Sequence, residues 1–143
     1  MAQFFRLDSV GNSVKPDLRD YFDGQVDIVM QSMPARVHEL LEEIPLFVED
    51  GPSVDLMHRL GVRHRAHLQG LYTGVPLGDR SVTHSGVMPD VVQIFREGIL
   101  ALATDGRGRI DEDELRRQIR ITILHELGHH HGMTEEDLES LGY

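Results

Sequence analysis

The sequence predicts a small single domain of the α+β class, in which a short mixed sheet packs with helices. Three apolar segments, 46–48, 68–73 and 91–95, are bounded by turn-forming residues, as short strands are. Apolar residues at helical spacing occupy much of the remaining chain, and the longest such segment, 111–131, lies near its end. A chain of 143 residues is near the commonest domain size and can bury a core.

The ends of the predicted elements follow from proline and glycine. Pro34 suits the first turn of a helix, Pro45 ends that helix, and Gly61 follows the last residue of another. Breakers interrupt residues 1–17, which we expect to form a partly ordered N-terminal extension to a domain at 18–143. In chain order, the sequence predicts helices at 18–33 and 34–44, a strand at 46–48, a helix at 54–60, a strand at 68–73, a loop at 74–86, a strand at 91–95, and helices at 99–104 and 111–131.

Composition excludes several classes of protein. The net charge of −10 argues against nucleic acid and anionic membranes as partners. The chain has no cysteine, so neither disulfides nor cysteine-bound zinc are expected. No run approaches the roughly 20 apolar residues of a membrane span, and the first residues lack a signal-peptide pattern. We therefore expect a cytoplasmic protein, with its oligomeric state left open.

The sequence His125-Glu126-Leu127-Gly128-His129 is the strongest functional signal. Two histidines four residues apart on a helix share one face and can bind one zinc ion. Glu126 can then reach a water molecule on that zinc, which is the HExxH arrangement of zinc hydrolases. Asp111 as N-cap and Glu114 as its capping-box partner predict where the helix begins.

A catalytic zinc usually takes three protein ligands and leaves one position for water. After a turn at Gly132, Thr134 and Asp137 form a second capping-box pattern, so a short helix is predicted from about Glu135. This turn would bring Glu135 back toward the metal as the third ligand. Glu136 and Asp137 remain alternatives to it.

The extended pattern resembles the minimal zincins, a group of small bacterial zinc metallopeptidases with the signature HExxHxxGxxD. Residues 68–77 resemble that family's GLYxGxPL segment, residues 88–96 its LPDxIxIYR strand, and residues 46–50 its VxVED strand. The match extends over roughly residues 20–143. The chain departs from the family in having Glu135 where aspartate is usual and His131 where an aromatic residue is common.

The resemblance implies a zincin-like fold and peptide-bond hydrolysis, with Zn²⁺ on His125, His129 and position 135. The zinc would lower the pKa of its water toward about 7, and Glu126 would act as the general base. The expected partner is a peptide or protein substrate of unidentified sequence. Segment 68–73 is either a sheet edge that pairs with this peptide or an internal strand.

Several alternatives stay open. HExxH can occur by chance on a surface helix, and a zincin-like domain can bind metal as a non-catalytic interaction module. Arg63-His64-Arg65-Ala66-His67 is locally basic and is either a solvated surface or a site for an acidic partner. The candidates for stabilising an oxyanion are Tyr72, Arg80, His84 and Tyr143.

Overall fold

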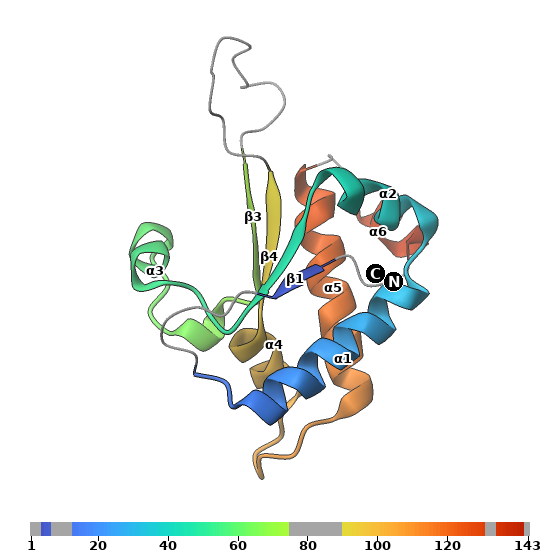
Figure 1. The fold of residues 1–143 in the computed structure, drawn as a ribbon. Helices are drawn as coiled ribbons and strands as arrows, with labels where there is room; N and C mark the ends of the chain where they lie inside the picture. Colours follow the sequence, from blue (N-terminus) through green and yellow to red (C-terminus); the bar gives the residue numbers. More distant parts are fainter. Residues whose placement is uncertain (1–3, 7–12, 75–89, 131–133, 142–143) are drawn as a thin grey trace.

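The computed structural model describes residues 4–6, 13–74, 90–130 and 134–141. They form a four-stranded sheet with helices packed mainly on one side, which confirms the predicted α+β class (Figure 1). The elements are β1 (Phe4–Arg6), α1 (Pro16–Ser32), α2 (Ala35–Glu43), β2 (Leu46–Glu49), α3 (Val54–Leu60), a 3₁₀ turn η1 (Arg65–His67), β3 (Gly70–Thr73), β4 (Val91–Phe95), α4 (Arg96–Ala103), α5 (Glu112–His130) and α6 (Glu135–Ser140).

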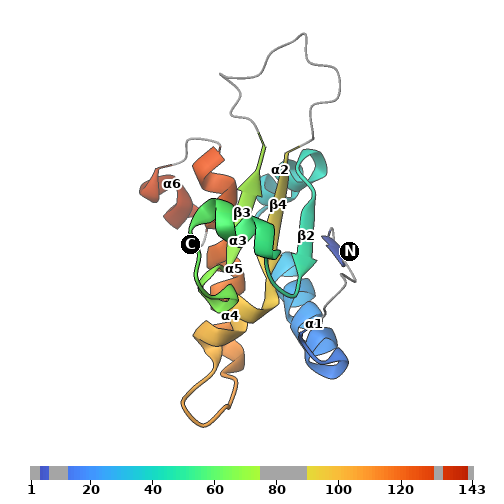
Figure 2. The same cartoon turned by 90° about the vertical axis from the view of Figure 1, so that its left-hand side faces the viewer.

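The sheet is mixed and has the strand order β1-β2-β4-β3. β1, β2 and β4 run parallel, whereas β3 is antiparallel to β4 and forms one edge (Figure 2). Because side chains alternate along a strand, one face of the sheet carries the fully buried Leu46, Val48, Val92 and Ile94. These residues form one core with α1, α2, α4 and α5.

The helix-end signals in the sequence correspond to caps in the structure. The Ser53 side chain accepts a hydrogen bond from the backbone N–H of Leu56 at the start of α3, and Gly61 ends that helix in the left-handed region at φ 69°. The Asp111 carboxylate accepts the backbone N–H of Glu114 at 3.0 Å and so caps α5 as predicted.

The predicted capping box at the start of α5 is wrong in its second half. The backbone N–H of Asp111 donates to the carbonyl oxygen of Ala103, which leaves it no need of Glu114. The Glu114 carboxylate instead accepts hydrogen bonds from Arg117 and Gln118, three and four residues further along the helix. A backbone hydrogen bond thus replaces the expected bond to a side chain.

Several elements differ in extent from the prediction. The helix predicted at 99–104 is α4, which begins at Arg96, directly after β4, and ends at Ala103. Arg65–His67 forms η1, so the strand predicted from residue 68 begins at Gly70. Residues 4–6, which belong to the predicted extension, pair with β2 as the outermost strand. The boundary between extension and domain at residues 17 and 18 stays a prediction. The predicted loop 74–86 lies, from residue 75 onward, outside the described residues.

A buried ion network joins α1 to the ends of β2 and β4. Arg96, with no exposed surface, donates to both oxygens of Asp23 at 3.0 Å and to Asp50 at 2.7 Å. The second oxygen of Asp50 accepts from the backbone N–H of Val14 at 3.2 Å and from Arg19 at 3.3 Å. Two arginines and two aspartates balance in charge, which is what burial of ionised groups requires.

None of the helices in the described part of the chain combines the length and apolar character needed to cross a bilayer.

Candidate active site

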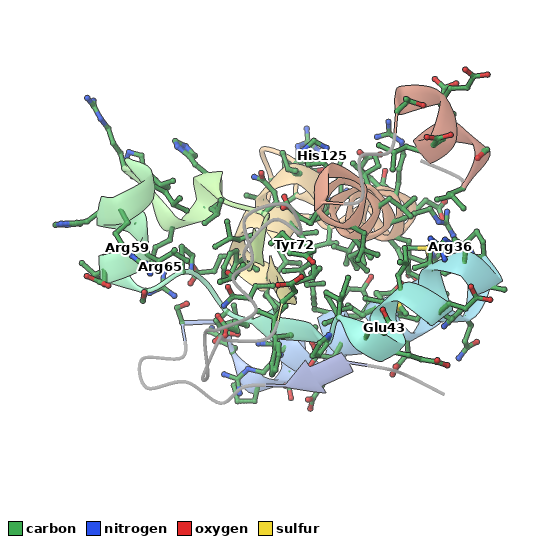
Figure 3. The ribbon with its side chains drawn as sticks, turned by 90° about the horizontal axis from the view of Figure 1, so that it is seen from above. Arg36, Glu43, Arg59, Arg65, Tyr72 and His125 are labelled. Atoms are coloured by element: carbon green, nitrogen blue, oxygen red, sulfur yellow. The ribbon has the colours of Figure 1, made fainter. Side chains whose placement is uncertain are left out.

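The helix α5 carries the HExxH sequence in its last two turns. It runs without interruption from Glu112 to His130, so His125 and His129 lie one turn apart on the same face. Figure 3 shows His125 on the opposite side of α5 from Glu43 and α2. The His125 and Glu126 side chains are half-buried, whereas the side chain of His129 lies outside the described residues.

A pocket of about 340 Å³ opens beside these two residues. One wall is the face of α5 that carries His125, and the other walls are the start of β3 and a residue of α4. Apolar and uncharged polar side chains line most of it, and the only carboxylate among its lining residues is that of Glu126. The lining residues are Leu68, Gln69, Gly70, Leu102, Gln118, Ile121, Thr122, His125 and Glu126.

Gly70 allows β3 to lie directly against the motif helix. A Cβ atom at this position would lie 2.6 Å from Cγ2 of Thr122 and 3.3 Å from Cγ of Glu126, closer than side chains pack. The contact therefore requires glycine, and it brings the first residue of β3 against the side chain of Glu126. The sheet edge and the HExxH glutamate meet at this point.

Some backbone groups of β3 do not pair with β4. The backbone N–H of Phe95 donates to the carbonyl oxygen of Gln69 at 2.8 Å, which makes Gln69 part of a hydrogen-bonded pair. In an antiparallel ladder the residues of such pairs alternate with residues whose backbone groups point outward. The backbone groups of Gly70 and Tyr72 therefore point away from β4. Among the strands that the structure describes, β3 lies at the edge of the sheet and is not an internal strand. Pairing of this edge with a peptide stays a prediction.

A close contact between Gly128 and Leu138 packs α6 against the end of α5. A Cβ atom on Gly128 would lie 2.6 Å from Cδ2 of the buried Leu138. Glycine inside the HExxH motif thus lets α6 pack on the helix that carries the histidines. The predicted capping box of α6 is confirmed, because Thr134 and Asp137 exchange both hydrogen bonds.

This packing bears on the candidates for the third ligand. Glu135 is the first residue of α6, and its side chain lies outside the described residues, as does all of Gly132. The Asp137 carboxylate accepts the backbone N–H of Thr134 at 3.0 Å, so part of its bonding capacity is used by the cap. Glu136 is exposed on the first turn. Of the two alternatives to Glu135, Glu136 is the one that the cap leaves available.

Only one of the candidate oxyanion stabilisers lies among the described residues. The Tyr72 hydroxyl donates to Oδ2 of Asp90 at 2.9 Å, and its ring is buried on the core side of β3 (Figure 3). Arg80, His84 and Tyr143 lie outside the described residues. The hydroxyl of Tyr72 is thus already bonded to a carboxylate in this structure.

The residues that form the pocket walls were not among those predicted from the sequence. Gln118, Ile121 and Thr122 precede His125 by seven, four and three residues, and this spacing places them on its helical face. That signal was available in the sequence. The wall formed by Leu68 and Leu102 was not, because it depends on how η1 packs on α4.

The part of the chain that forms the candidate site matches a known protein family. The model of the zincin-like metallopeptidase family matches residues 41–143, which is 103 of the 143 residues. The match begins within α2 and includes β2, β3, β4, the pocket and both helices of the motif. No match was found among curated proteins.

Proposed function

The chain belongs to the zincin-like metallopeptidases, and on that premise we propose that it hydrolyses peptide bonds with zinc and with Glu126 as general base. The observation that carries the proposal is the pocket in which the HExxH glutamate and the first histidine lie beside the edge strand β3. A site that only stored or structured a metal would need neither the edge nor a carboxylate next to the ligand.

His125, His129 and Glu135 would hold the metal. Two imidazoles and one carboxylate are a donor set that zinc accepts in catalytic sites. The half-buried His125 at the pocket wall fits this role, since an ion and water can reach it from the pocket. Gly128 and Leu138 support it from the other side, because their contact fixes the helix that begins at Glu135. When bound, zinc would activate water and polarise the substrate carbonyl.

Glu126 would transfer the proton. Its carboxylate lines the pocket next to His125, and Gly70 packs against its Cγ, which restricts where the side chain can point. In the proposed reaction Glu126 takes a proton from the attacking water and delivers it to the nitrogen of the leaving amine. Positioned proton transfer of this kind contributes about 10²–10⁴-fold to a rate.

The edge of β3 would hold the substrate. The outward backbone groups of Gly70 and Tyr72 can pair with an extended peptide, as in recognition by strand addition. A peptide paired there lies next to Glu126, because Gly70 contacts that side chain. The expected partner is therefore an unfolded segment or a loop that can adopt an extended conformation.

The decisive test compares Glu126→Gln with the wild-type protein. Zinc content would be measured by mass spectrometry of the metal and cleavage by incubating a pool of randomised peptides with and without chelator. We expect the Glu126→Gln protein to retain zinc and to lose at least about 100-fold in cleavage rate. Glu112→Gln makes the same chemical change at an exposed position of α5 and should cleave at the wild-type rate.

Two outcomes would contradict the proposal. Cleavage by zinc-loaded Glu126→Gln at the wild-type rate would remove Glu126 from the mechanism. Wild-type protein that binds zinc but cleaves no peptide in the pool would favour the non-catalytic metal-binding module.

A further inference from the structure

One segment of this acidic protein is basic. Residues 56–67 contain three arginines, three histidines and no acidic residue, although acidic residues outnumber basic ones by 24 to 14 in the whole chain. The segment comprises most of α3, the connection after it and η1. Within it, η1 packs on α4, and Figure 3 shows Arg59 and Arg65 on this segment.

Arg65 has a structural role within this segment. Its Nε donates to the Glu97 carboxylate on α4 at 2.9 Å. Gly51 makes room for the pair, because a Cβ there would lie 2.6 Å from the Arg65 guanidinium and 2.7 Å from the Glu97 carboxylate. The backbone of Leu68 touches Gly98 of α4 so closely that no side chain would fit between them. Both contacts fix η1 and the residue after it on α4.

The other charged and polar side chains around η1 face solvent. Arg63, His64 and His67 are exposed, and we call these three residues the basic rim. Within the part of the chain that the structure describes, no carboxylate lies within ion-pair distance of Arg63. The rings of His64 and His67 contact each other edge to face at 5.0 Å. Arg63 therefore supplies a permanent positive charge that the described fold does not use.

The basic rim is continuous with the candidate active site. His67 is followed directly by Leu68, Gln69 and Gly70, which line the pocket and lead into β3. Only Leu68 and Gln69 separate the end of η1 from the start of β3. A ligand that extends past the start of β3 reaches the rim next.

The direction in which a bound peptide runs along β3 determines which of its ends reaches the basic rim. Antiparallel pairing is somewhat more stable than parallel pairing. A peptide antiparallel to β3 has its N-terminal side near Thr73 and its C-terminal side near Gly70. The residues after the cleaved bond then lie over the pocket and toward the basic rim.

We propose that the basic rim binds a carboxylate on the C-terminal side of the cleaved bond, so that the enzyme prefers substrates that are acidic there. The inference rests on the proposed peptidase function. The carboxylate can be an acidic side chain or the free C-terminus of a short peptide, since an arginine and two imidazole N–H donors suit both. Exposed ion pairs are weak, so the expected preference is about 2- to 5-fold for one charge.

The test uses matched peptides around a sequence cleaved from the randomised pool. One series carries glutamate, glutamine or lysine two to four residues after the cleaved bond, and a second carries a free or an amidated C-terminus at the same distance. We expect kcat/KM to fall from glutamate to lysine in the first series, or from free to amidated terminus in the second. The preference should shrink as salt rises, because exposed charges are screened.

Variants assign the preference to the rim. Arg63→Glu should reverse the order of glutamate and lysine peptides. Arg59→Glu makes the same change of charge on α3, where Arg59 pairs with Asp55 at 3.7 Å, and should keep the wild-type order. Equal kcat/KM for all peptides in wild-type enzyme, or a preference that survives Arg63→Glu, would overturn the inference while leaving the peptidase proposal intact.

A binding experiment separates this inference from the proposed function. Fluorescence anisotropy of labelled glutamate and lysine peptides on zinc-loaded Glu126→Gln protein measures affinity without cleavage. Tighter binding of the acidic peptide, lost in Glu126→Gln/Arg63→Glu, would support the rim even if the wild type cleaves nothing. Equal affinities would count against it.

Discussion

Replacing Arg96 by methionine should destabilise the protein more than a substitution at any exposed ion pair. The change keeps the length of the side chain but removes the guanidinium from two carboxylates that are 1% and 2% exposed, those of Asp50 and Asp23. Three charge-assisted hydrogen bonds, at about 1.5–3 kcal/mol each, set an upper bound of about 5–9 kcal/mol. The guanidinium itself no longer has to be desolvated, which reduces the expected loss to about 3–5 kcal/mol.

Chemical and thermal unfolding would measure this loss. For a chain of 143 residues, about 3–5 kcal/mol corresponds to a melting temperature lower by roughly 10–15 °C. Arg36→Met is the matched control, because Arg36 pairs with Glu39 at 3.7 Å with both side chains more than half exposed, and should cost less than about 1 kcal/mol. Asparagines in place of Asp23 and Asp50 should restore part of the stability of Arg96→Met. A loss below about 1 kcal/mol for Arg96→Met would refute the reasoning, since it would mean that water solvates the two carboxylates.

Further substitutions test a half-buried carboxyl group and two glycines. Burial raises the pKa of Glu49 above its ordinary value of 4.5. The stability that this group contributes is therefore fully present below pH 4.5, and it is lost as pH rises through the pKa of the folded state. Glu49→Gln should therefore raise the free energy of unfolding at pH 7 and lose this advantage below about pH 4.5, as measured by denaturant titration with exposed Glu39→Gln as control; an equal gain at both pH values would contradict the sign. Gly128→Ala places a methyl group against Leu138, so it should lower the free energy of unfolding by about 1–3 kcal/mol and weaken zinc binding. At Gly24 an added methyl group meets no atom within 4 Å, so Gly24→Ala should stabilise its helix by about 0.5–1 kcal/mol. Zinc affinity unchanged in Gly128→Ala would show that the packing of α6 does not support the metal site.

Elements with local end signals were predicted from the sequence closely. The helix α3 has the predicted bounds because Ser53 caps one end and Gly61 adopts a positive φ at the other. Strand β4 also has its predicted bounds, 91–95. In these cases the information lies within a few residues, which is the range over which capping and alternation act.

Contacts between distant residues could not be predicted in this way. Arg96 and Asp23 are 73 residues apart, and nothing near either residue signals that they pair. The pairing of β1 with β2 likewise joins segments about 40 residues apart. Glu114 was assigned to the wrong partner, because the backbone N–H of Asp111 already donates to the carbonyl oxygen of Ala103.

The candidate site likewise could be predicted from the sequence only in part. The positions of His125 and Glu126 on one long helix followed from spacing alone, since helical geometry fixes which residues share a face. The pocket beside them did not, because it arises where η1, β3 and α4 meet α5. The contact of Gly70 with Glu126 shows why, because the sequence reveals only that position 70 is a glycine. The packed structure is needed to show that this glycine lies against the side chain of Glu126.

The shortness of β3 limits how tightly its edge can hold any peptide. Two residues, Gly70 and Tyr72, present outward backbone groups, which allows at most about four hydrogen bonds. At a net value of about 1 kcal/mol each, these bonds amount to about 4 kcal/mol, which corresponds to a dissociation constant near 1 mM. Main-chain pairing alone would therefore release most peptides before they react. Residence time on this enzyme, and with it the choice among the many extended segments in a cell, must come from side chains that enter the pocket or reach beyond it.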